Sequence, residues 1–120
     1  MSALIGAHTR LGIALCVVLL GGAAWAVIAQ LRHTGAAALR AYLVLCAGAV
    51  GLEAIVGVVL VATGHRPRSL IHWFYGGAAL ISLPIADGLC RRLPAREEGV
   101  IILGGAVAAL LFAFRAVTTG

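Results

Sequence analysis

Four long stretches of the chain are apolar almost throughout, and most polar residues gather in the gaps between them. A helix that crosses the ~30 Å hydrocarbon core of a bilayer needs about 20 mostly apolar residues, because each residue adds about 1.5 Å. The pattern therefore predicts four membrane-spanning helices, at residues 11–29, 41–62, 70–89 and 100–117. The connections are too short to fold alone, so we expect residues 1–120 to form a single transmembrane domain, an all-α four-helix bundle.

The composition points to the same class of protein. Hydrophobic residues make up 62% of the chain and charged residues 11%, against about half and about a quarter in soluble domains. The formal net charge is +5, and all nine basic residues are arginines. Nucleic-acid-binding proteins present these charges on a solvated face, whereas here they lie mostly in short gaps between apolar runs. We therefore expect contact with the lipid bilayer and no binding of nucleic acid.

The arginines also predict an orientation. The first and third connections carry Arg32, Arg40, Arg91, Arg92 and Arg96, while the amino-terminal segment and the second connection carry Arg10, Arg66 and Arg68. Positive charge is enriched in the cytoplasmic loops of membrane proteins. This predicts a multi-pass protein of the bacterial plasma (inner) membrane, with both termini and the second connection outside.

Glu53 is the most unusual residue within the apolar stretches. It lies eleven residues before Gly64, roughly 16 Å along a helix and near the bilayer centre. A carboxylate at that depth costs a few kcal/mol, so it should face the bundle interior and be protonated or paired. Gly57, one turn further on, leaves a notch where another helix can approach. Glu53 is therefore a candidate proton or cation site, the alternative being a neutral acid hydrogen-bonded across helices.

Two histidines form a second candidate site. His8 precedes the first predicted helix and His72 opens the third, so both should lie near the same membrane surface, each followed after one turn by a glycine. Histidines on facing helices are one way in which a bundle holds haem b. Four arginines lie near enough in depth to pair with propionates: Arg10, Arg66, Arg68 and Arg115. A quinone or lipid-headgroup pocket and simple interfacial anchoring stay open as alternatives.

Two other charged positions need partners. Arg115 lies about one turn inside the end of the last predicted helix, and because arginine keeps its charge it must reach the interface or find an acid such as Glu53. Asp87 and Arg91 are four residues apart with the acid first, which predicts a surface ion pair on one helix.

Other chemistry has little support in the sequence. Cys16, Cys46 and Cys90 are odd in number and match no metal-binding spacing. The chain has no phosphate-binding loop, no nucleophile elbow and no carboxylates paired for hydrolysis. We predict no metal ligands and no catalytic residues, and we favour a protein that is not an enzyme.

The second half of the chain resembles a pattern found in small, uncharacterised four-helix bacterial membrane proteins. The resemblance implies the four-helix architecture and draws attention to Glu53, His72, Tyr75 and Arg115, but it carries over no activity. Its matching segments are 64–67, 71–76, Pro84 and 115–120.

Three functions follow from these observations. The first is a non-catalytic accessory or scaffold subunit of a larger membrane complex, such as an electron-transfer complex, because the short connections leave no room for a catalytic domain and glycine and alanine faces can pack against other subunits or a second copy. The second is a small proton-coupled transporter that uses Glu53. The third is a module that binds haem b or quinone, with His8, His72, Tyr75, Arg66, Arg68 and Arg115 as candidate cofactor-binding residues.

Overall fold

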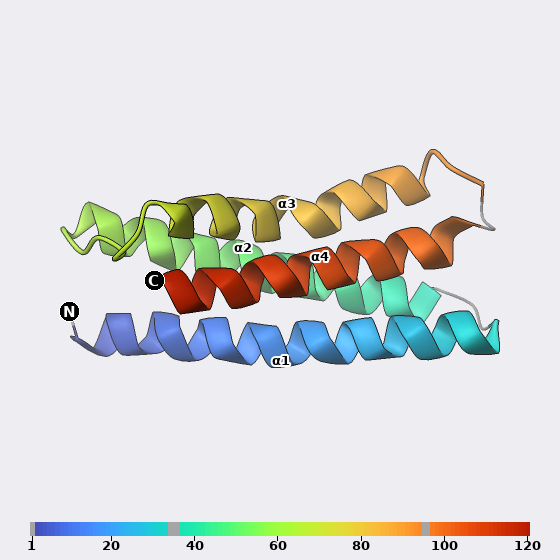
Figure 1. The fold of residues 1–120 in the computed structure, drawn as a ribbon, viewed down its shortest axis with the longest axis horizontal. Coiled ribbons are helices and arrows are strands. Elements are labelled where there is room, and N and C mark those ends of the chain that lie inside the picture. The colour runs from blue at the N-terminus through green and yellow to red at the C-terminus, as the bar shows by residue number, and fades with distance from the viewer. Residues whose placement is uncertain (1, 34–36, 95–96) are drawn as a thin grey trace.

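The computed structural model describes residues 2–33, 37–94 and 97–120, which form four helices packed along one long axis (Figure 1). The helices are α1 (Ser2–Arg32), α2 (Ala37–Ala62), α3 (Ile71–Cys90) and α4 (Glu98–Thr119). Their directions alternate, so the α2–α3 connection lies at the same end of the bundle as the start of α1 and the end of α4 (Figure 1). We call this the terminal end, and the other the opposite end. The predicted all-α four-helix bundle is confirmed.

The dimensions and the outer surface suit a bilayer. The bundle is 47 Å long, close to the ~40–45 Å thickness of a membrane with its headgroup regions. Each of the four helices is long and apolar enough to cross it. Large apolar side chains such as Leu31 and Leu45 are about three-quarters exposed, which is expected where the surrounding solvent is lipid.

Two predicted helix boundaries were wrong, and both errors affect the candidate sites. The first helix begins at Ser2, not at residue 11, so His8 lies inside α1 rather than before it. The polar residues near its start end the apolar run without breaking the helix, and the Thr9 hydroxyl donates to the Ile5 carbonyl one turn back at 3.1 Å. The second helix begins at Ala37, so Arg40 belongs to α2 and not to a connection. Arg96 lies outside the described residues.

A glycine ends α2 at the terminal end. Gly64 has a φ of +91°, a conformation that a residue without a Cβ adopts at little cost. The amide of Gly64 donates to the Val61 carbonyl and that of His65 to the Leu60 carbonyl, both at 2.9 Å. These are the two bonds of a Schellman motif, and they turn the chain sharply out of α2 toward α3.

The interior of the bundle is made largely of small side chains. Half of the buried apolar residues are alanines, among them Ala106 and Ala109, which are fully buried. Helices pack closely at such residues in membranes. One close approach is between α3 and α4, where Gly105 faces the Ala86 side chain. The helix α4 packs extensively against both α3 and α1, whereas the seam between α2 and α3 is looser.

Candidate functional site

Glu53 on α2 faces His8 on α1. The Glu53 Oε1 and His8 Nδ1 atoms are 2.9 Å apart, and the two side chains are 14% and 24% exposed. Glu53 therefore turns toward a neighbouring helix rather than toward lipid. The distance is that of an ion pair, and the interaction joins two helices that are consecutive in the chain.

The contact leaves hydrogen-bonding capacity unused. Within the described part of the chain, Glu53 Oε2 and His8 Nδ1 are buried atoms without a hydrogen-bond partner, although Nδ1 lies 2.9 Å from Oε1. Buried polar atoms in proteins are nearly always hydrogen-bonded. Each of the two side chains therefore keeps a polar atom that could take part in a further hydrogen bond.

His72 on α3 adds a third polar group. Its ring lies edge to face against the His8 ring, with centroids 6.2 Å apart and planes at 73°. The Nδ1 atom of His72 lies 2.8 Å from the Ala116 carbonyl on α4. A carbonyl only accepts, so Nδ1 carries the hydrogen, and Nε2 holds the lone pair when the ring is neutral. We call Glu53, His8 and His72 the Glu53 cluster; all four helices hold it in place.

Glycines make room for the Glu53 cluster. A Cβ atom at Gly57, on the helix of Glu53, would lie 3.4 Å from His8 Cε1. Reciprocally, a Cβ atom at Gly12, on the helix of His8, would lie 3.4 Å from Glu53 Oε1 and 3.0 Å from a Val117 methyl. The predicted notch one turn after Glu53 is therefore filled by the histidine ring.

The other candidate residues lie apart from Glu53. The Arg115 guanidinium is 5.4 Å from the centroid of the Tyr75 ring, a cation–π arrangement, and its side chain is exposed. Arg115 therefore lies against Tyr75, and the residue beside Glu53 is His8. Arg66 and Arg68 are exposed in the α2–α3 connection.

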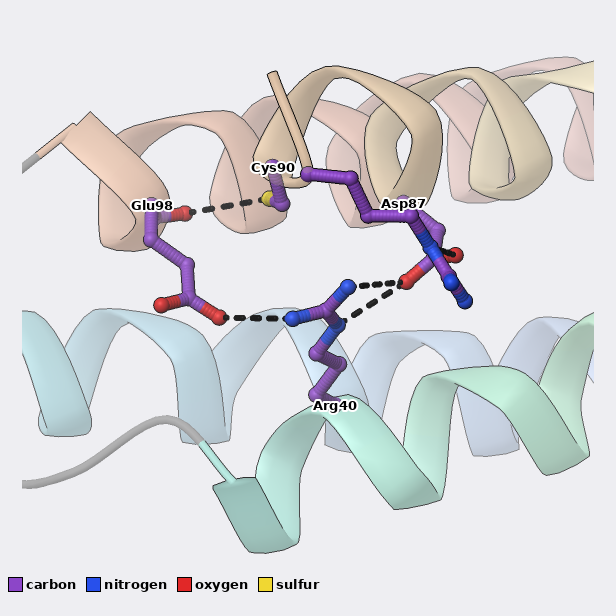
Figure 2. A network of polar contacts seen from close by, with 5 residues as sticks. Arg40, Asp87, Cys90 and Glu98 are labelled. Carbon is purple, nitrogen blue, oxygen red and sulfur yellow. Dashed lines mark hydrogen bonds and ion pairs between the residues drawn. The ribbon is translucent and has the colours of Figure 1, made fainter. Parts of the chain in front are cut away.

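A second group of charges ties the helices together at the opposite end (Figure 2). Arg40 on α2 contacts Asp87 Oδ1 on α3 through Nε and Nη2, both at 2.9 Å. Its Nη1 atom lies 3.5 Å from Glu98 Oε1 on α4. Arg91 Nε donates to Asp87 Oδ2 at 2.9 Å, so the predicted pair on one helix is present. We call Arg40, Asp87, Arg91 and Glu98 the Arg40 network.

The role of Arg40 does not follow from the sequence. Asp87 and Glu98 are 47 and 58 residues away from it along the chain, so no local spacing reveals the contacts. The available signal was the position of all three residues at helix ends that antiparallel packing places together.

The fold and the two charged groups define a small, multi-pass integral membrane protein with polar residues at a buried interhelical position. Among the described residues, no group of three or more histidine, cysteine, aspartate or glutamate side chains is arranged to hold a metal ion. The chain matches no protein-family model, no curated protein and no solved structure. The resemblance of its second half to small bacterial membrane proteins therefore stays a prediction.

Proposed function

We propose that the Glu53 cluster is a proton-binding site and that the protein is a small transporter that couples the binding and release of a proton to transport across the membrane. The observation that carries this proposal is the partly buried Glu53 carboxyl, which faces His8 at 2.9 Å and whose second oxygen is a buried atom without a hydrogen-bond partner among the described residues. Ionisable residues inside membrane bundles commonly mark proton or ion pathways.

The chemistry of the pair favours this role. With one proton between them, a carboxylate with an imidazolium and a carboxylic acid with a neutral imidazole both have zero net charge. That state avoids the cost of an uncompensated charge in an apolar interior. Gain of a second proton or loss of the first leaves a net charge, so a change in protonation can alter how α1 and α2 pack.

The surroundings of the Glu53 cluster favour proton exchange with the water at the terminal end of the bundle. His72 lies near the start of α3 at that end, and its Nε2 atom holds the lone pair of the neutral ring because Nδ1 donates to the Ala116 carbonyl. Toward the opposite end the interior is filled by apolar side chains such as Leu19, Leu43 and Ile102. Release on the other side would thus require the helices to move, as in a proton-coupled transporter.

Infrared difference spectroscopy on the protein in lipid nanodiscs tests proton binding directly. A pH change should produce the carbonyl band of a protonated carboxyl, which Glu53→Gln removes and His8→Gln shifts. Glu98→Gln, the same change at the opposite end, should leave it in place. Proton uptake by proteoliposomes under an imposed potential should likewise be lost in Glu53→Gln, altered in His8→Gln and unchanged in Glu98→Gln. If Glu53→Gln changes neither readout, the proposal is wrong.

An accessory or scaffold subunit is the second candidate function. Exposed glycines on three helices favour it, because a Cβ atom at Gly48, Gly77 or Gly104 would meet nothing within 4 Å. Such open small-residue positions let another helix approach closely, either from another subunit or from a second copy. Purification from native membranes should then yield a stable partner or a homo-oligomer, and a lone monomer would contradict this role.

Haem b or quinone binding also stays a prediction. His8 and His72 lie side by side, but a macrocycle between them would need the two rings to part, since they are in edge-to-face contact. The visible spectrum of the purified protein after haem supplementation decides this: a Soret band lost in His72→Ala would support it.

The orientation belongs to the same proposal. We place the terminal end outside the plasma membrane, as the distribution of arginines indicates. A tag joined to Gly120 should then be reached by a membrane-impermeant reagent added to intact cells.

A further inference from the structure

A groove runs between α2 and α3 beside the Arg40 network. It has a volume of about 200 Å³, and its inner part is lined by apolar residues that include Leu43, Ala47, Leu83 and Pro84. Arg40 and Asp87 line both this groove and a wider hollow on the surface, which Arg91 and Glu98 also line. The groove is thus apolar inside and charged at its mouth, and it follows the seam between α2 and α3, which is looser than those of α4 with α3 and with α1.

The mouth offers both signs of charge. Arg91 is 71% exposed on its side chain and uses only Nε for Asp87, which leaves its terminal nitrogens as donors. Glu98 contacts Arg40 through one carboxylate oxygen at a long 3.5 Å, so its other oxygen is an acceptor. The two arginines and two acids described at the mouth carry no net charge. Nη1 of Arg40 carries two hydrogens and lies 3.5 Å from Glu98 Oε1, so a donor and an acceptor lie within reach of one ligand that has both charges.

The depth of the mouth matches the headgroup layer of a bilayer. Arg40 lies in the first turn of α2, Asp87 in the last turn of α3, and Glu98 begins α4. Tyr42 packs against Trp25 close by, with ring centroids 5.6 Å apart, and these two residue types are enriched at the membrane interface. The apolar part of the groove therefore lies at the level of the acyl chains.

We propose that this groove binds one phospholipid whose headgroup carries a phosphate and a primary ammonium, as in phosphatidylethanolamine. The phosphate contacts Nη1 of Arg40, the ammonium donates to the Glu98 carboxylate 3.5 Å from that nitrogen, and one acyl chain covers Leu43, Ala47 and Pro84. The proposal rests on the complementary charges at the mouth and is independent of the role of Glu53.

Native mass spectrometry of the full-length protein tests it, with equal amounts of phosphatidylethanolamine, phosphatidylcholine and phosphatidylglycerol that share the same acyl chains. A charge-assisted hydrogen bond is worth about tenfold in affinity, so retention of phosphatidylethanolamine should exceed that of phosphatidylcholine, whose quaternary ammonium cannot donate, by about that factor. Glu98→Gln should reduce this preference, because an amide attracts the ammonium less.

The second part of the experiment uses variants whose larger side chains fill the groove. Ala47→Leu should lower retention of all three lipids, while Ala49→Leu, on an exposed part of α2 outside the groove, should not. If Ala47→Leu does not fold, Ala41→Leu at the mouth replaces it. Equal retention of the three lipids, a preference for phosphatidylglycerol, or retention that Ala47→Leu and Ala41→Leu both leave unchanged would each overturn the proposal.

Discussion

His8 Nδ1 and Glu53 Oε1 lie 2.9 Å apart, so the acid nine residues before the end of α2 has its partner on α1, six residues after the start of that helix at Ser2. This relationship explains two other features. Gly57 and Gly12 lie beside the pair, each on the helix of one member and next to the side chain of the other. The faces of α1 and α2 that carry His8 and Glu53 are therefore also the faces at which the two helices come close.

Removal of one member of this pair should destabilise the bundle more than removal of both. His8→Ala leaves the partly buried Glu53 carboxyl without its partner, at a cost of about 1–3 kcal/mol. In His8→Ala with Glu53→Leu no orphaned polar group remains, so stability should recover in part. Unfolding in mixed detergent micelles gives the four free energies of a double-mutant cycle, and an additive cycle would show that the pair does not interact.

Neighbouring glycines on α4 should respond differently to the same substitution. A Cβ atom at Gly105 would collide with the Ala86 Cβ and lie 3.6 Å from the Ser82 carbonyl, whereas one at Gly104 would meet nothing within 4 Å. Neither neighbour of Gly105 is the end of a flexible chain, so α3 and α4 must move apart in Gly105→Ala, at about 1–3 kcal/mol.

Gly104→Ala is the matched control. It adds the same methyl group one residue away and should be neutral or slightly stabilising, because alanine is the better helix former. Both variants are compared by their unfolding midpoints. Equal midpoints would mean that α3 and α4 are not packed as closely as the Gly105 and Ala86 contact requires.

Much of the fold follows from the sequence, because the apolar runs that must cover a bilayer are long and well separated. The inward direction of Glu53 also follows, since lipid cannot solvate a carboxylate. The contact partners of the charged side chains do not follow from the sequence. From the sequence, Arg115 is the one charged partner suggested for Glu53, and only the relative rotation of α1, α2 and α4 decides that His8 lies beside Glu53 while Arg115 covers Tyr75.

The Arg40 network should stabilise the opposite end in a salt-dependent way. Arg40→Gln removes the contacts to Asp87 and Glu98 and should lower the unfolding midpoint, and the difference from the unchanged protein should shrink at high salt because ions screen partly exposed charges. Arg40→Lys should recover little, since one ammonium cannot reproduce the forked contacts of the guanidinium. Arg10→Gln, an exposed position on α1, is the control, and an equal effect there would contradict a specific network.

Tyr42 should hold α1 and α2 together through its ring and its hydroxyl. The hydroxyl donates to the Val18 carbonyl at 2.7 Å, and a Cβ atom at Gly22 would lie 2.9 Å from the ring. Interhelical hydrogen bonds in membrane proteins are worth about 0.6 kcal/mol on average, so Tyr42→Phe should cost about that much and leave the helices in place.

Gly22→Ala should have the larger effect, because the new methyl group must push the Tyr42 ring aside and overpacking costs about 1–3 kcal/mol. Trp25 reports the movement, since its ring lies 5.6 Å from that of Tyr42. The fluorescence of Trp25 should therefore change in Gly22→Ala and stay nearly constant in Tyr42→Phe. Trp73→Phe in the background of both variants leaves Trp25 as the only tryptophan, and an unchanged spectrum in Gly22→Ala would show that the ring does not pack on this glycine.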